Sequence, residues 1–451
     1  MTASTIVPVP ARPKVLFVCP DAVGERMSGL GIRYVELART LTPHADVTVA
    51  TGAPQSTPVD GVRTAGYAVH APAQLRALIA RADAVVAPPQ WPLVARWLRS
   101  SEARVIHDVY TPEALETAQL FAGRPPMVRR LMVSAALDRL HDALSTAHHL
   151  ICASEKQRDL WLGALHATRR ITPERSDRDP GLRDTIDTVP FGTSAQPPRR
   201  SGGPGIRGQF PQIGPQDEIV LWNGGIWRWL DAPTAVRAVA LLAERRPAVR
   251  LVFMGTAAAA QAPAARRATE QAQAVARELG ALGDTVLFHS DWVPYAERVD
   301  WLLDAGCALS THADTLESRY AFRTRLLDCF WAGLPTVVTA GDDLAARVLA
   351  DGLGEVVAPG DIGGTADAIE RVLDRGRDVY APALASASAA YAWPVAAQAL
   401  VRWISEPGQP SAGRLAPRAA TRRTAAHRVR ATSYLLARPM IARLGLHTPS
   451  G

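Results

Sequence analysis

The chain has few cysteines and no long hydrophobic run. Its four cysteines, Cys19, Cys152, Cys307 and Cys329, lie far apart within apolar segments, so their spacing fits neither a disulfide framework nor a zinc site. No stretch approaches the roughly eighteen consecutive apolar residues of a membrane-spanning helix, and residues 1–13 lack the charged start and apolar core of a signal peptide. We therefore expect buried thiols and a cytoplasmic protein that crosses no membrane.

Acidic residues and lysine are absent from the end of the chain. Residues 407–451 contain eight arginines, whereas the net charge of the whole chain is +7, so the rest of the protein is close to neutral. Apolar residues interleaved with these arginines predict a weakly amphipathic segment that lies on an anionic membrane, at the inner face of the cell membrane. A solvated disordered tail is the alternative. Nucleic-acid binding is disfavoured, because the tail has little aromatic content.

The length and composition predict more than one α/β domain. The chain has 451 residues, of which 47% are hydrophobic and 21% charged, which is enough apolar material for two or three cores. In the first half, an apolar strand at 15–19, a helix at 34–41 and a strand at 47–50 give the order of a parallel sheet. Pro, Gly, Arg and Gln then dominate residues 196–216, which we interpret as an interdomain linker.

Glycines and polar residues follow two strands of the first half. Gly29, Gly31 and Arg33 stand at the start of the first helix, where glycine allows close backbone approach and free N–H groups point at a ligand. The stretch lacks the G-x-G-x-x-G pattern, which disfavours a nicotinamide enzyme. His107 and Asp108 directly follow an apolar strand, and we expect them at the cleft because ligands bind outside the carboxyl ends of parallel strands. A plain tight turn and a backbone-capping histidine are the respective alternatives.

Two segments of the second half combine basic residues with helix starts. Gly224, Gly225 and Arg228 follow the strand at 218–222, and this strand–glycine–helix order suits close approach to a phosphate. Residues 311–343 place acids and arginines around an apolar helix that ends at a Gly-Leu-Pro turn. Basic side chains at a helix N-terminus bind anions, and a nearby carboxylate can hold sugar hydroxyls. The segment therefore predicts a site for a nucleotide diphosphate sugar.

This second segment resembles the donor site of GT-B glycosyltransferases of the family 4, or group 1, type. Glu317 matches the first acid of that site, with Asp314 as a competitor, Asp328 matches the second, and residues 331–338, WAGLPTVV, match the turn and strand that follow. The resemblance covers roughly residues 14–404. It implies an α/β protein with two Rossmann-like domains facing across a cleft.

The resemblance also implies an activity and a set of site residues. The activity is retaining transfer of a sugar from a nucleotide-diphosphate donor to a hydroxyl acceptor, with no cofactor and no metal. We expect catalytic roles for His107, Asp108 and Glu317, and a cleft loop made of Gly29, Gly31 and Arg33. The expected donor-binding residues, with Trp292 beside the nucleobase, are Gly224, Gly225, Arg228, Trp292, Arg323, Thr324, Arg325 and Asp328.

The resemblance divides the chain and suggests an acceptor. We expect an N-terminal extension at 1–13, an acceptor domain at 14–195, the linker at 196–216, a donor domain at 217–384, a crossing-back helix at 385–404 kinked at Trp393-Pro394, and a basic tail at 405–451. The tail favours a lipid-linked saccharide of bacterial cell-surface polysaccharide assembly as acceptor, and no nucleic acid. The alternatives are a non-catalytic nucleotide-binding partner subunit and a nucleotide-sugar epimerase of the same fold.

Overall fold

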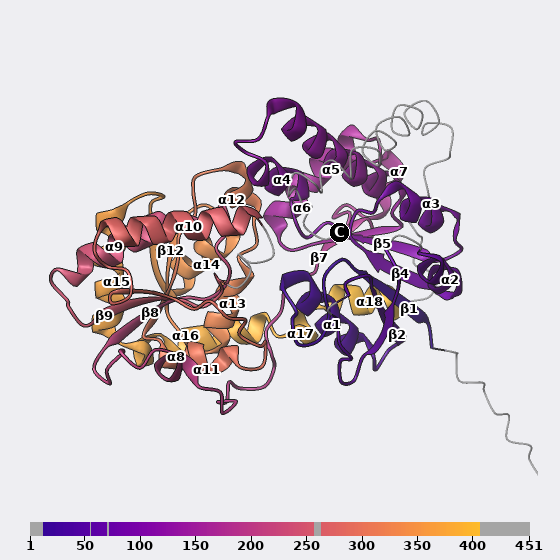
Figure 1. The fold of residues 1–451 in the computed structure, drawn as a ribbon. Coiled ribbons are helices and arrows are strands. Elements are labelled where there is room, and N and C mark those ends of the chain that lie inside the picture. The colour runs from indigo at the N-terminus through magenta and orange to yellow at the C-terminus, as the bar shows by residue number, and fades with distance from the viewer. Residues whose placement is uncertain (1–11, 55, 70–71, 257–262, 406–451) are drawn as a thin grey trace, which may run out of the picture.

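The chain folds into two α/β domains that lie side by side (Figure 1). The structure is a computed structural model, and it describes residues 12–405 except 55, 70–71 and 257–262. The basic tail and most of the N-terminal extension lie outside the described residues. Within the described part, no helix is both long and apolar enough to span a membrane, and all four cysteines are buried free thiols, as predicted.

The first domain is built on a seven-stranded parallel sheet with the order β3-β2-β1-β4-β5-β6-β7. Strand β1 pairs with β2 and β4, with Val15 opposite Val47 on one side and Ala84 on the other. Strand β4 and, after Lys14, strand β1 are continuous apolar runs, as expected where helices cover both faces of a sheet, whereas the edge strands β3 and β7 are short and contain polar residues. The strands are β1 Lys14–Cys19, β2 Asp46–Thr51, β3 Arg63–Gly66, β4 Ala84–Ala87, β5 Arg104–Asp108, β6 His149–Cys152 and β7 Ile186–Thr188.

Helices connect these strands. They are α1 Gly29–Leu41, α2 Ala73–Arg81, α3 Pro92–Ser100, α4 Glu113–Leu120, α5 Pro126–Thr146, α6 Glu155–Ala167 and α7 Pro173–Arg178. Helix α6 is capped by Ser154, whose hydroxyl accepts from the backbone N–H of Gln157. The Gln157 side chain returns a bond to the backbone N–H of Ala153. This leaves the Gln157 amide group free to donate elsewhere.

The second domain has a six-stranded parallel sheet with the order β10-β9-β8-β11-β12-β13. Its strands are β8 Glu218–Trp222, β9 Val249–Phe253, β10 Val286–Phe288, β11 Cys307–Ser310, β12 Thr336–Thr339 and β13 Gly354–Val357. Its helices are α9 Ala232–Ala243, α10 Pro263–Glu278, α11 Arg298–Asp304, α12 Leu316–Tyr320, α13 Thr324–Trp331, α14 Asp343–Asp351 and α15 Ile362–Arg375. A glycine is required after β9, because a Cβ on Gly255 would lie 2.4 Å from the Gly224 carbonyl carbon. The turns after β8 and β9 therefore pack directly on each other.

The segment predicted as a linker packs on the second domain. It contains the short helix α8 Gly205–Gln209, in which Ile206 is fully buried. The backbone N–H of Ile206 donates to the Asp304 carboxylate over 2.8 Å, and the Trp331 indole N–H donates to the Gln196 carbonyl over 2.7 Å. Apolar burial and these bonds hold part of this segment against the second domain.

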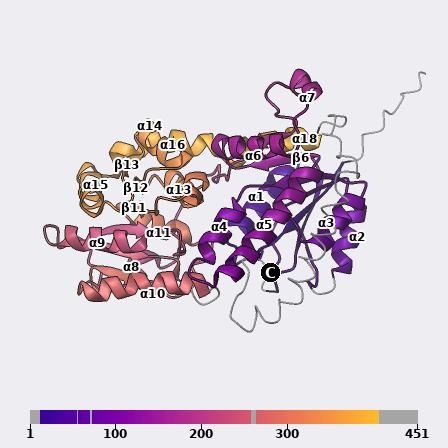
Figure 2. The same cartoon turned by 90° about the horizontal axis from the view of Figure 1, so that it is seen from above.

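The chain then crosses back to the first domain (Figures 1 and 2). The predicted single kinked helix is instead three helices, α16 Arg377–Ala390, α17 Trp393–Ala396 and α18 Gln398–Ser405. Pro394 stands in the first turn of α17, where a missing N–H costs nothing, so the proline starts a helix rather than kinking one. Trp393 packs on Phe191, and Trp403 stacks on His149 with ring centroids 5.2 Å apart.

Candidate active site

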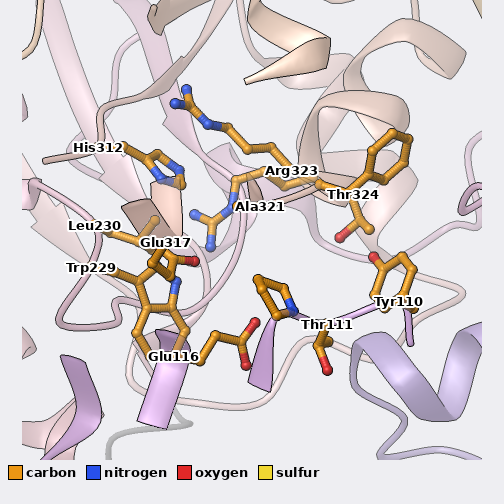
Figure 3. Close-up of a pocket in the computed structure, with 13 residues that line it drawn as sticks. Tyr110, Thr111, Glu116, Trp229, Leu230, His312, Glu317, Ala321, Arg323 and Thr324 are labelled. Atoms are coloured by element: carbon orange, nitrogen blue, oxygen red, sulfur yellow. The ribbon is translucent and has the colours of Figure 1, made fainter. Parts of the chain in front are cut away.

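A pocket opens between the domains, at the carboxyl ends of strands from both sheets (Figure 3). The first domain supplies the residues after β5 and the start of α4. The second domain supplies the loop between β8 and α9, His312 after β11, helix α12 and the start of α13. The lining residues are Tyr110, Thr111, Pro112, Glu116, Trp229, Leu230, His312, Glu317, Ala321, Phe322, Arg323, Thr324 and Arg325.

Arg325 is the pocket cation that is placed to bind an anion. Its Nη2 donates to the Gly225 carbonyl over 3.0 Å, and its own carbonyl accepts from the Asn223 side chain over 2.8 Å. Its Nη1 is buried and, within the described residues, has no hydrogen-bond partner. Burial lowers the pKa of Arg325 to about 10, so the group stays charged at neutral pH. The structure thus brings Arg325 together with the Gly224–Gly225 turn.

Arg323 also lines the pocket, but most of its guanidinium nitrogens bond other groups of the second domain. It forms an ion pair with Asp342, and its Nη1 donates to the Thr339 carbonyl over 2.9 Å. Asp342 in turn caps helix α14 by accepting from the Ala345 N–H. The Arg323 guanidinium therefore ties the start of α13 to the end of β12. Only its Nη2, buried and without a partner in the described chain, is left for a ligand.

His312 is a buried neutral side chain of the pocket wall. Neither ring nitrogen has a hydrogen-bond partner among the described residues, although the side chain is only 4% exposed. Burial, and then the charges of Arg323 and Arg325, hold the pKa of His312 well below its ordinary value. A neutral imidazole facing the pocket can donate one hydrogen bond and accept another.

Two carboxylates face each other across the pocket from different domains. Glu116 comes from α4 and Glu317 from α12, and these helices pack against each other. Burial and then the charges of Glu317 and Glu113 raise the pKa of Glu116 to about 8. Burial raises the pKa of Glu317 to about 7, although the Arg323 charge and the Ser318 hydroxyl oppose the shift. At neutral pH the pair therefore holds at least part of one proton.

Removing the Glu116 charge should make the protein less sensitive to alkaline pH. A carboxyl whose folded-state pKa lies above its unfolded value favours folding most when protonated. The stability that the protonated carboxyls of Glu116 and Glu317 contribute is complete below about pH 4.5, their ordinary pKa. It is lost as the pH rises through 7 to 8, their pKa values in the folded protein. We expect the Glu116→Gln variant to gain in melting temperature relative to wild type between pH 5 and pH 9, as measured by calorimetry. Glu113→Gln should show a smaller gain, because Glu113 is ion-paired with Arg139 and its charge is the smallest of the causes that raise the pKa of Glu116.

Asp328 is placed elsewhere than predicted. Its carboxylate pairs with Arg298 of α11 over 3.0 Å, and the side chain does not line the pocket. The Arg298 guanidinium also lies 3.4 Å from the centroid of the Tyr295 ring. Burial raises the pKa of Asp328, and the Arg298 charge opposes that shift. The helix turns this carboxylate toward α11, which no local sequence pattern reveals.

The expectation that His107 lies at the cleft is not met. His107 is 2% exposed and does not line the pocket, and its Nδ1 lies 3.2 Å from the Ala87 carbonyl of the neighbouring strand. Burial lowers the pKa of His107. The side chain points into the domain rather than toward the cleft because His107 is still inside β5, two residues before the sheet edge that carries Val109 and Tyr110.

Asp108 and Arg33, predicted separately as site residues, are paired with each other beneath the pocket. Arg33 donates to both Asp108 oxygens, over 2.8 and 3.2 Å, and is 0% exposed. It also donates to the carbonyls of Val189 and Pro190. Its guanidinium lies 4.5 Å from the centroid of the Tyr110 ring, which lines the pocket. The pair therefore positions a pocket wall without contacting the pocket itself.

The glycine loop at α1 is closed by a protein carboxylate. The Asp21 carboxylate accepts from the backbone N–H groups of Leu30 and Gly31 and from the Ser28 hydroxyl. Gly31 is required there, because a Cβ would lie 2.3 Å from the Ala22 carbonyl oxygen, whereas Gly29 has open space around it. Asp21 thus occupies the N–H groups that were expected to face a ligand.

The remaining predicted residues divide between the pocket and its surroundings. Thr324 lines the pocket and bonds Tyr110 of the opposite domain. Trp292 lies outside the pocket and donates to the Glu25 carbonyl across the interface over 3.3 Å. Arg228 is exposed, outside the pocket, and next to Gly123 of the first domain.

Helix α6 holds the two walls of the pocket together. The Gln157 side-chain N–H donates to the carbonyls of Tyr110 and Tyr320, over 2.8 and 2.9 Å, one in each domain. Beside it, Lys156 donates to the Gly341 carbonyl and pairs with Asp343 over 3.4 Å. These bonds set the first-domain wall against the second-domain wall.

The comparisons with known proteins concern the fold. No protein-family model matches the sequence, and no curated protein matches it. Among solved structures, WaaG, a glycosyltransferase involved in lipopolysaccharide biosynthesis, matches with a TM-score of 0.61 at 16% identity, covering 87% of this chain and 100% of that chain. Anabaena HepE in complex with UDP matches with a TM-score of 0.62 at 12% identity, covering 87% and 99%. The chain has the GT-B fold.

A third GT-B match agrees with this assignment. Sucrose-phosphate synthase from Thermosynechococcus elongatus has a TM-score of 0.60 at 17% identity, covering 87% of this chain and 98% of that chain. The two parallel sheets and the returning C-terminal helices therefore form a GT-B architecture, as the sequence predicted. In this GT-B chain the sequence missed Glu116, Tyr110, Trp229 and His312. Tyr110 and His312 stand two residues after a strand and Glu116 is in the first turn of α4, which is the signal that could have found them, whereas Trp229 lies in the loop between β8 and α9 and has no such signal.

Proposed function

We propose that the chain is a retaining glycosyltransferase of the family 4 type that moves a sugar from a nucleoside-diphosphate donor to a hydroxyl acceptor. The observation that carries the proposal is the polarity of the interdomain pocket. Arg325, with a buried Nη1 that lacks a partner among the described residues, marks one part of the pocket, beside the Gly224–Gly225 turn and the start of α13. Carboxylates from both domains mark another part. The first part suits a diphosphate and the second suits the polar groups of a sugar.

In this mechanism the chain stabilises the leaving group and orients the sugar. Arg325 and the N–H groups at the start of α13 neutralise the charge that develops on the departing diphosphate. Glu317 and His312 hold sugar hydroxyls, and the bonds made by Gln157 keep the acceptor-domain wall in place. The attacking hydroxyl passes its proton to the departing phosphate oxygen, so the proposal requires neither a protein nucleophile nor a metal.

The named neighbours support a nucleotide-sugar donor and a polysaccharide setting. HepE has been solved in complex with UDP-glucose, and WaaG is involved in lipopolysaccharide biosynthesis. We propose by the same analogy that the acceptor is a lipid-linked saccharide of cell-surface polysaccharide assembly. The chain's two lysines, Lys14 and Lys156, among 50 basic residues are typical of a GC-rich bacterial genome, where such assembly is common.

A thermal-shift screen tests the donor assignment. The full chain is melted with UDP, dTDP, GDP and their sugar derivatives, first in EDTA and then with Mg²⁺. We expect one base to raise the melting temperature, because a ligand at a hundred times its Kd adds about 2.7 kcal/mol of stability. The rise should be equal in both conditions, because the proposal requires no metal. Transfer to an added acceptor is then followed by mass spectrometry. No shift with any nucleotide would overturn the proposal, and binding without transfer to any acceptor would favour a non-catalytic partner.

A further inference from the structure

The acidic part of the pocket contains more negative charge than the described residues compensate. The Glu116 carboxylate has no hydrogen bond or ion pair within the described chain, and its charged neighbours that raise its pKa are two further acids, Glu317 and Glu113. Glu113 already has a partner in Arg139. The pocket arginines bond elsewhere, Arg323 to Asp342 and Arg325 to the Gly225 carbonyl, and neither forms an ion pair with Glu116 in the described chain. A bound ligand can supply that cation.

Glu317 adds an independent sign that a ligand is missing. It is only 2% exposed, yet its Oε2 is buried without a hydrogen-bond partner in the described structure. Leaving a buried charged group unpaired costs several kcal/mol. The nearest arginine, Arg323, is committed to Asp342 and Thr339. The free oxygen of Glu317 is therefore available to a ligand in the pocket.

An aromatic side chain completes this part of the pocket. Figure 3 shows the Trp229 indole beside the Glu116 and Glu317 side chains. The indole is fixed by stacking on Trp227, with ring centroids 5.4 Å apart and planes 4° apart. Two carboxylates beside an aromatic ring form a surrounding that favours an ammonium group over a neutral amide or hydroxyl, because a cation gains from the two charges and, where it lies over the ring, from the ring quadrupole.

We propose that Glu116, Glu317 and Trp229 bind the free protonated amine of an amino sugar or aminocyclitol. This inference deepens the proposed transferase function and rests on it. The amine belongs either to the sugar of the donor or to the acceptor, because the site lies between the donor and acceptor domains. The diphosphate binds at Arg325, and the protonated amine binds at the two carboxylates. The two ends of the pocket therefore bind ligand groups of opposite charge.

Calorimetric titration of the full chain at pH 7 separates the two sources of the amine. In one arm, UDP-glucosamine is compared with UDP-N-acetylglucosamine and UDP-glucose. In the other, glucosamine and 2-deoxystreptamine are compared with N-acetylglucosamine and glucose, with and without UDP. A preference of at least tenfold for the amine in the first arm assigns it to the donor, and a preference in the second arm alone assigns it to the acceptor. Equal affinities in both arms overturn the proposal.

Variants show whether the preference belongs to this site. Glu116→Gln should abolish the amine preference while UDP alone binds as it does to wild type. Glu113→Gln, which removes the same charge from the same helix outside the pocket, should keep the preference. An amine preference that survives in a folded Glu116→Gln variant, as judged by circular dichroism, overturns the assignment. Failure of UDP, dTDP and GDP all to bind, with the free amines still preferred, would reject the transferase function and keep the amine site.

Proton release gives a readout that a purely structural role would not produce. The charged groups that act on the two carboxylates are Glu113 on α4, Arg323 before α13 and Asp342 before α14. Arg325 and the neutral His312 line the same pocket. An ammonium ion should displace up to about one proton from the pair, because it favours both ionised carboxylates. Repeating the titration in PIPES and in MOPS, buffers that differ in ionisation enthalpy and contain neither a primary ammonium group nor phosphate, measures this release. Neutral sugars should release none, and equal release by amine and neutral sugar would contradict the proposal.

Discussion

Replacing Arg325 by alanine should weaken nucleotide binding between about tenfold and a hundredfold. A hydrogen bond to a charged group contributes about 1.5–3 kcal/mol, and each 1.4 kcal/mol is a factor of about ten in affinity. Arg325 is the strongest candidate for that bond because its Nη1 is buried without a partner in the described chain and its Nη2 orders the Gly225 turn. Isothermal titration with the nucleotide selected by the thermal-shift screen measures the loss. Arg325→Lys should restore part of it, since a lysine keeps the charge but not the planar fork.

Arg228→Ala is the matched control for this result. It removes the same charge from the same domain, but Arg228 is exposed and does not line the pocket. We expect its nucleotide affinity to stay within twofold of wild type. Arg323→Ala is less informative, because it also leaves Asp342 buried without its ion pair. If Arg228→Ala weakens binding as much as Arg325→Ala does, the diphosphate does not bind in this pocket.

The features that the sequence predicted well depend on neighbours along the chain. The alternation of buried strands and helices, the Gly-Gly turn after β8 and the arginines at the start of α13 are each encoded within a few residues. Parallel strands then bring their carboxyl ends to one edge, so the Gly225 turn and Arg325 meet although 100 residues separate them. The residue pattern of each segment, together with the rule that parallel strands end at one edge of the sheet, was enough to bring Arg325 and the Gly225 turn together.

The features that were misplaced depend on which partner a charged group finds across the fold. Asp328 has the position of a sugar-binding acid along the chain, but Arg298 of another helix takes its carboxylate. The N–H groups at the start of α1 look available in the sequence, but Asp21 occupies them. Glu116 shows the reverse case, since it looks like an ordinary helix-start acid until the opposite domain places Glu317 near it. Side-chain pairing of this kind is set by tertiary geometry and leaves no local signal.

Replacing Asp108 by alanine should lower the free energy of unfolding by about 3–5 kcal/mol, because it leaves the Arg33 guanidinium buried without its counter-charge. Both side chains are almost completely buried, at 0% and 1% exposure. Arg33 joins α1 to β5 and to the carbonyls after β7, so the loss should appear in the first domain. Guanidinium unfolding followed by tryptophan fluorescence measures it. Asp367→Ala, which breaks an exposed pair with Arg245, should leave the unfolding midpoint unchanged.

A double variant separates the cost of an unpaired charge from the value of the pair itself. Arg33→Met combined with Asp108→Leu removes both charges, and replacing a buried pair by apolar groups is often close to neutral. It should recover at least half of the stability that Asp108→Ala loses. The double variant should still bind nucleotide less tightly than wild type, because Tyr110 loses the guanidinium that it lies against and its ring forms part of the pocket wall. An Asp108→Ala protein as stable as wild type would mean that another group neutralises Arg33, and the pair would then not position that wall.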